Sequence, residues 1–256
     1  MKLSKTHERW APFVLLTLVL LLWQAVVVLF KIPEFIFPSP WQIAQQFVEF
    51  SGPILQAAWK TFWVTMLGFA LAIVVGVLLG FLVGSSRMAY AALYPLLVAF
   101  NAVPKAAVVP ILVVWFGIGL GPGILTAFLI SFFPITVNIA TGLATLEPEL
   151  EDVLRVLGAK RWDVLVKVGL PRSMPYFYGS LKIAITLAFV GTVLAEMTAG
   201  DSGIGYLMQS AGSQQRMPLA FAGLVTIGAM AMAMYELFSW IEKRTTGWAH
   251  RGMQGE

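Results

Sequence analysis

Long apolar stretches separated by short polar links dominate the pattern of this chain. A helix needs roughly 20 apolar residues to cross the hydrocarbon core of a bilayer. The pattern therefore predicts six transmembrane helices, at residues 12–30, 61–84, 91–116, 124–143, 177–199 and 219–241. Basic residues precede the first stretch as they do in a secretory signal, but the apolar run is too long and no small-x-small site follows. We therefore expect a retained first helix and one all-α membrane domain over residues 1–256.

Composition supports a membrane environment. Hydrophobic residues make up 59% of the chain and charged residues 12%, whereas soluble domains have about 45–50% and about 25%. The chain has no cysteine, which excludes disulfides, thiolate chemistry and cysteine metal sites. Its two histidines, His7 and His250, lie near the termini, where neither a metal site nor a general base is expected. We therefore expect no catalytic residue and no metal ligand.

The distribution of basic residues orients the six predicted spans. Three basic residues fall on one side of the membrane: Lys31, Lys60 and Arg216. Twelve fall on the other: Lys2, Lys5, Arg9, Arg87, Arg155, Lys160, Arg161, Lys167, Arg172, Lys243, Arg244 and Arg251. Because cytoplasmic loops carry the excess of Lys and Arg, both termini are predicted to be cytoplasmic.

A short helix is expected in the outer loop after the first span. Ser39 can cap its first turn and Pro40 suits the first helical position. The residues that follow place one apolar face along the helix, formed by Trp41, Ala44, Phe47 and Val48. This amphipathic pattern is typical of a helix lying at the membrane interface.

The second span carries a small residue at every fourth position, at Gly68, Ala72, Gly76, Gly80 and Gly84. Such a stripe lets two helix backbones approach closely in lipid. Packing within one subunit and contact between subunits both remain open, the former being at least as well supported.

Residues 145–175 form the one long cytoplasmic link, and it is patterned. Acidic residues crowd a helix start, with Pro148 in the first turn, which suits the positive end of the helix dipole. An amphipathic stripe follows at Leu150, Val153, Leu154 and Leu157. Gly158 then ends this helix as a left-handed C′ residue, and a second short helix is expected up to Pro171, which closes it.

Two interpretations of this helix–glycine–helix elbow stand. It can lie on the bilayer, or it can bind a cytosolic protein. Anionic lipid would repel the acidic first helix, so the pattern favours the docking element.

The elbow resembles the EAA motif of binding-protein-dependent ABC importer permeases. That motif runs Glu-Ala-Ala, three residues, Gly, nine residues, Ile-x-Leu-Pro. Here it reads Asp152-Val153-Leu154, then Gly158, then Val168-Gly169-Leu170-Pro171. The spacing, the glycine and the Leu-Pro pair are kept, and the two alanines are the main departure.

The resemblance extends over nearly the whole chain and is closest to the taurine/sulfonate/nitrate type. Segments that carry it include Asn101-Ala102-Val103-Pro104-Lys105 through Pro110, Trp115 to Gly119, Phe133-Pro134 through Asn138, Ala195-Glu196, and Gly203 to Leu207. It implies the six-helix transmembrane domain of type I (MetI-like) importers, with two permease copies around a central path. The implied solute is small and anionic or heterocyclic, such as taurine, alkanesulfonates, nitrate, or pyrimidine and riboflavin-like precursors.

The resemblance also implies partners. The elbow of each permease copy would be the coupling helix and would bind one of two ATPase subunits, which hold ATP and Mg. An extracytoplasmic binding protein would deliver the solute, lipid surrounds the spans, and no nucleic acid is expected. The coupling residues implied are Glu151, Asp152, Leu154, Leu157, Gly158, Ala159, Lys160, Arg161, Leu170 and Pro171.

The sequence agrees with this division of labour, because no G-x-x-x-x-G-K-[ST] phosphate loop occurs in it. Gly117, Gly119, Gly121 and Gly123 alternate, but no Lys-Ser/Thr pair follows, and we expect them in a tight outer turn.

Charged residues inside spans are costly and are usually paired or functional. At about 1.5 Å per residue, Lys105 and Glu196 lie roughly 21 and 28 Å from the inner side, and Lys182 and Glu236 lie near it. Depth therefore allows the pairs Lys105–Glu196 and Lys182–Glu236. The first pair is either a structural salt bridge or a pair that lines the path. For the second pair, the favoured interpretation is that both side chains snorkel to the membrane interface.

The candidates for lining the translocation path are Asn101, Pro104, Lys105, Pro110, Asn138 and Glu196. Prolines at positions 104, 110 and 134 free backbone carbonyls and kink their helices, and irregular backbone is tolerated where it faces a cavity. Asn101 and Asn138 can instead bond across helices, which is the more favoured interpretation.

Two other classes compete. A gradient-driven secondary transporter or channel needs an ion or proton relay, and no intramembrane histidine or inverted repeat supports one. A membrane enzyme needs a catalytic cluster, and no motif of the H-E-x-x-H kind occurs.

Overall fold

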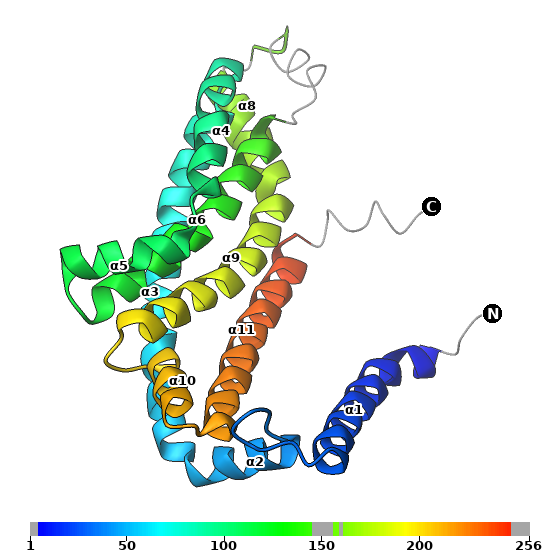
Figure 1. Cartoon of the computed structure of the whole chain (residues 1–256). Helices are drawn as coiled ribbons and strands as arrows, with labels where there is room; N and C mark the ends of the chain where they lie inside the picture. The colour runs from blue at the N-terminus through cyan, green and yellow to red at the C-terminus, as the bar shows by residue number, and fades with distance from the viewer. Residues whose placement is uncertain (1–4, 145–155, 159–160, 247–256) are drawn as a thin grey trace.

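A computed structural model describes residues 5–144, 156–158 and 161–246 of the chain (Figure 1). Its elements are helical throughout, which confirms the predicted all-α class. In chain order they are α1 Lys5–Leu29, α2 Pro40–Glu49, α3 Ser51–Gly84, α4 Arg87–Ala102, α5 Lys105–Phe116, α6 Leu120–Ala144, α8 Arg161–Val164, the π-helical turn η1 Leu165–Gly169, α9 Leu170–Ala199, α10 Ile204–Ser213 and α11 Met217–Thr245.

Five helices in the described residues are long and apolar enough to cross a membrane: α1, α3, α6, α9 with the turn before it, and α11. The pair α4 and α5 brings the number to six if the two together count as one span. The predicted stretch 91–116 is therefore apolar as expected, but it is not one continuous helix.

The break between α4 and α5 turns the chain by 83°. Val103 has an extended backbone there, with φ −65° and ψ 126°, because the ring of the following proline disfavours helical geometry at the preceding residue. Sequence analysis predicted a kink at Pro104; the structure has a complete break. Pro110 and Pro134 lie inside α5 and α6 without ending them.

Helices α3, α6 and α9 form the core of the bundle. The small-residue stripe of α3 lies directly on α6: a Cβ added at Gly76 would lie 2.9 Å from the Cβ of Ile135, and one at Gly80 would lie 2.7 Å from that of Ile139. Gly191 of α9 meets the backbone of Ala127 in the same way. The stripe therefore packs within one subunit, which is one of the two interpretations that the sequence left open.

Helix α1 stands apart from this core (Figure 1). Only 6% of its apolar span is buried within the chain, against 50% for α6. The aromatic contacts of α1 with the rest of the chain are made by Trp23, whose ring centroid lies 5.2 Å from that of Phe37 and 6.2 Å from that of Phe221 in α11. Most of α1 is thus left for lipid or for another chain to cover.

The short helix α2 begins as predicted. The Ser39 hydroxyl accepts from the Gln42 amide at 3.3 Å, and the Gln42 side chain accepts from the Ser39 amide at 2.8 Å, forming a capping box. Ile43 is buried against the bundle, whereas the apolar face that contains Trp41 and Val48 is exposed.

Candidate functional site

The described part of the predicted elbow is a short exposed turn. Val156 and Leu157 are 88% and 77% exposed. Gly158 has φ +85°, which confirms the predicted left-handed conformation, and open space surrounds the position of a Cβ. The other elbow residues before α8 that were singled out, including Glu151, Asp152, Leu154, Ala159 and Lys160, lie outside the described residues.

From Arg161 the chain is helical without interruption into α9. Helix α8 begins at Arg161, and η1 leads directly into α9. Pro171 was predicted to close the second elbow helix, and this is wrong: it lies in the first turn of α9. Because proline has no N–H, the carbonyl of Lys167, within the π-helical turn, lacks its α-helical donor.

The first turns of α9 are packed against the end of α6. Ser173 is buried, and a Cβ added at Gly142 would lie 2.9 Å from the Ser173 Cβ. Movement of the elbow would therefore act on a helix that is already part of the core.

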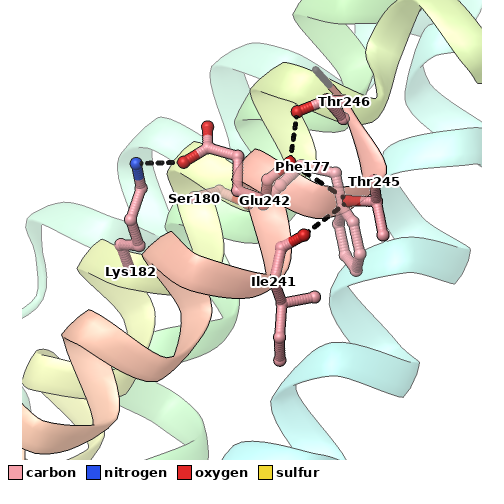
Figure 2. Close-up of polar contacts among 7 residues, drawn as sticks. All are labelled: Phe177, Ser180, Lys182, Ile241, Glu242, Thr245 and Thr246. Atoms are coloured by element: carbon pink, nitrogen blue, oxygen red, sulfur yellow. Dashed lines mark hydrogen bonds and ion pairs between the residues drawn. The ribbon is translucent and has the colours of Figure 1, made fainter.

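A buried ion pair joins α9 to the end of α11 (Figure 2). The Lys182 ammonium lies 2.6 Å from a Glu242 carboxylate oxygen, and their side chains are 19% and 11% exposed. Thr246 donates its hydroxyl to the Glu242 backbone carbonyl at 2.8 Å. The predicted partner, Glu236, was wrong: its side chain lies at an exposed position of α11, and Lys182 pairs with Glu242 instead.

Two of the path candidates meet at the break between α4 and α5. The Lys105 ammonium donates to the Asn101 side-chain oxygen at 3.0 Å, to the Phe100 carbonyl at 3.3 Å and to the Asn101 carbonyl. Lys105 thereby satisfies carbonyls at the open end of α4. Asn101, Pro104 and Pro110 are exposed on the chain surface.

Glu196 lies elsewhere, buried in the last turn of α9. Thr61 of α3 donates its hydroxyl to the two carboxylate oxygens, at 2.8 and 2.9 Å, and the Gly205 amide of α10 donates at 2.8 Å. The Ile204 amide donates to the same Thr61 hydroxyl at 2.8 Å. The pair with Lys105 that depth allowed is therefore not formed; Glu196 joins α3, α9 and α10 instead.

Glycines make room for this carboxylate. Gly203 has φ +95°, and a Cβ there would overlap the Glu196 carboxylate. A Cβ at Gly205 would lie 2.7 Å from the Glu196 Cβ. The Gly203-Ile204-Gly205 segment therefore fits around the acid, and only glycine suits the first of these positions.

Asn138, the remaining path candidate, bonds within its own helix. Its side-chain nitrogen donates to the Pro134 carbonyl at 2.8 Å, one turn earlier in α6. The bond across helices that the sequence favoured is not the one formed.

Sequence reasoning did not single out Thr61, Thr65 and Thr192. The Thr65 and Thr192 hydroxyls lie 2.9 Å apart, between α3 and α9. A threonine inside an apolar helix commonly bonds its own preceding turn, so nothing in the sequence marked these three as links between helices.

Residues 72–247 match the family described as the inner membrane component of binding-protein-dependent transport systems. The chain belongs to this family. It is thus an ABC importer permease subunit, a multi-pass protein of a bacterial inner-membrane transport system, and the resemblance drawn from the EAA motif is confirmed.

Named relatives cover almost the whole permease. A probable ABC transporter permease of Haemophilus influenzae is 32% identical over 233 residues, which are 91% of this chain and 95% of that protein. The riboflavin transport system permease RibX of Chloroflexus aurantiacus is 35% identical, over 92% and 88%. The taurine permease TauC of Escherichia coli is 28% identical, over 91% and 87%.

Among solved structures, the permease resembles the MetNI methionine ABC transporter in an inward-facing conformation. The TM-score is 0.66 at 19% identity, covering 75% of this chain and 96% of that one. At this identity the similarity shows the fold, and it confirms the predicted MetI-like architecture.

Proposed function

We propose that two copies of this permease form the path for a small organic solute across the cytoplasmic membrane, with both termini in the cytoplasm. A separate ATPase subunit, holding ATP and Mg, would bind residues 145–175 of each copy. A binding protein would deliver the solute at the opposite face. Family membership and the missing phosphate loop support this division of labour.

The observation that carries the coupling proposal is the turn at Gly158. Two exposed apolar side chains, Val156 and Leu157, precede it, and from Arg161 onward α8 and η1 run without interruption into α9. Exposed apolar side chains at a surface turn suit a protein interface. Because α9 packs on α6 and is held to α11 by Lys182, a push at the elbow would tilt a connected set of helices.

Replacing Gly158 by Val tests this role. A β-branched residue at φ +85° costs more than the ~1 kcal/mol of ordinary left-handed strain, and a distorted turn changes the angle at which the elbow meets its partner. We expect normal insertion in the membrane and loss of ATPase stimulation by solute-loaded binding protein. Intact stimulation would refute the coupling role.

The bend between α4 and α5 is our candidate for lining the path. It interrupts a segment that is apolar enough to span the membrane, and irregular backbone is tolerated there where it faces a cavity. The side chains on it or in the adjoining helix turns are Asn101, Pro104, Lys105 and Pro110. Lys105 is the one cation among them, which suits a solute with an anionic group.

Replacing Lys105 by Met tests the path. The change removes the charge and keeps most of the side-chain volume, so we expect the protein to assemble and uptake to fall severalfold. Assembly is measured by co-purification with the ATPase and uptake in proteoliposomes. Normal uptake would remove Lys105 from the path.

A further inference from the structure

A pocket of about 380 Å³ with charged residues in its lining lies between the first turns of α3 and helix α10. Gln56 and Lys60 line it from α3, and Tyr206 and Ser210 from α10. The two loops that flank α10 contribute Asp201 and Arg216. In the proposed orientation, this end of the permease faces outward.

The pocket carries more positive than negative charge. Within the described residues, neither Lys60 nor Arg216 forms an ion pair, and Arg216 lies 5.9 Å from the Phe50 ring. Asp201 is the one acid in the lining, and its carboxylate accepts the Ser202 hydroxyl at 2.8 Å. Two cations against one acid in a concave site attract small anions.

The wall formed by α10 is held in place. Its first two amides are bonded to Thr61 and to the Glu196 carboxylate, each at 2.8 Å. A wall that is already ordered loses little conformational freedom when a ligand binds. The buried network around Glu196 therefore keeps the pocket preformed.

The rest of the lining is mostly apolar and includes Ala57, Leu207 and Leu219. The volume falls within the roughly 300–1,000 Å³ of small-molecule sites. A ligand that fills it needs an apolar body in addition to a charged group.

We propose that this pocket is an outer binding site for a small organic anion, whose carboxylate or sulfonate is held by Lys60 and Arg216 and whose apolar body lies against Ala57, Leu207 and Leu219. The proposal rests on the proposed outward orientation, and it narrows the solute class from anionic or heterocyclic to anionic.

The absence of cysteine from the chain allows a direct test. Ser210→Cys places a single, nearly isosteric thiol in the pocket. The purified permease in phosphatidylcholine nanodiscs is treated with a sulfonated or a trimethylammonium methanethiosulfonate reagent, and the two modification rates are compared.

We expect the ratio of anionic to cationic reagent rates to fall about tenfold when Lys60→Gln and Arg216→Gln are added. Lys31→Gln, a matched change of a basic residue outside the pocket, should leave the ratio unchanged. Butanesulfonate should slow modification more than methanesulfonate does, and uncharged butanol should not slow it. The proposal would be overturned if Lys60→Gln and Arg216→Gln left the ratio of modification rates unchanged, or if neither sulfonate slowed modification of the thiol.

A second arm separates solute from lipid. If phosphatidylglycerol in the nanodisc slows modification and butanesulfonate does not, the pocket holds a lipid headgroup and the solute proposal fails. The labelling requires neither ATPase nor binding protein. Failure of coupled transport would therefore refute the proposed function while leaving the pocket result intact.

Discussion

Two buried acids hold the two ends of this permease together by different means. Glu196 and Glu242 are each 8% exposed. Glu242 pairs with a cationic side chain, whereas Glu196 accepts from a hydroxyl and a backbone amide. An ion pair joins two helices through side chains alone. The Glu196 carboxylate also fixes the backbone at the start of α10, so its replacement leaves polar groups behind on other elements.

The largest effect is expected for Glu196→Leu. The Gly205 amide and the Thr61 hydroxyl lose their buried acceptor, and each unsatisfied group costs about 1–3 kcal/mol. We expect the free energy of unfolding in mixed micelles to fall by about 4 kcal/mol. Glu236→Leu, at an exposed position of α11, is the matched control and should change stability by less than about 0.5 kcal/mol. Equal effects at the two positions would remove the special role of Glu196.

Lys182→Met comes next. It leaves the Glu242 carboxylate without its cation, which costs about 3 kcal/mol for a buried pair. The double change Lys182→Met with Glu242→Met removes both charges and should recover most of that loss, because Thr246 bonds the Glu242 backbone and not its carboxylate. A double-mutant cycle in micelles measures the coupling. Additive losses would show that the two side chains do not interact.

The smallest losses of stability are expected for alanine substitutions at two glycines, which test whether the space beside Glu196 requires a glycine. Gly203 and Gly158 both have positive φ, but only at Gly203 would a Cβ overlap other atoms, those of Glu196. We expect Gly203→Ala to cost about 2–3 kcal/mol and Gly158→Ala about 1 kcal/mol. Adding Glu196→Ala should reduce the cost of Gly203→Ala if the overlap is its cause. Thermal unfolding of the two glycine variants, of Glu196→Ala and of the double variant Glu196→Ala with Gly203→Ala decides this.

Local features of the fold could be predicted from the sequence. The helix cap at Ser39, the left-handed Gly158 and the close-packing stripe of α3 each depend on residues within a few positions, and the structure confirms all three. Pro171 shows the limit of such signals: a proline after one helix and a proline in the first turn of the next look the same in sequence.

The candidate site was only partly predictable for a related reason. Lys105 and Asn101 are four residues apart and meet as neighbours on the chain do. Thr61, which bonds the Glu196 carboxylate, is 135 residues from it, and Glu242 is 60 residues from Lys182. The depth of a residue in the membrane gives its position along one axis only. Because the rotation of each helix is not known from sequence, depth could not identify which acid meets which cation.

The sequence by itself determined that this chain is an all-helical membrane permease with a patterned link at residues 145–175, because span length, composition and motif spacing are properties of contiguous residues. The sequence marked a kink at Pro104, but tertiary structure alone decided its 83° size, the partners of the buried charges and the cationic pocket beside α10. Each of these depends on how helices rotate and pack against one another, and that is set by the fit of whole surfaces rather than by any local pattern.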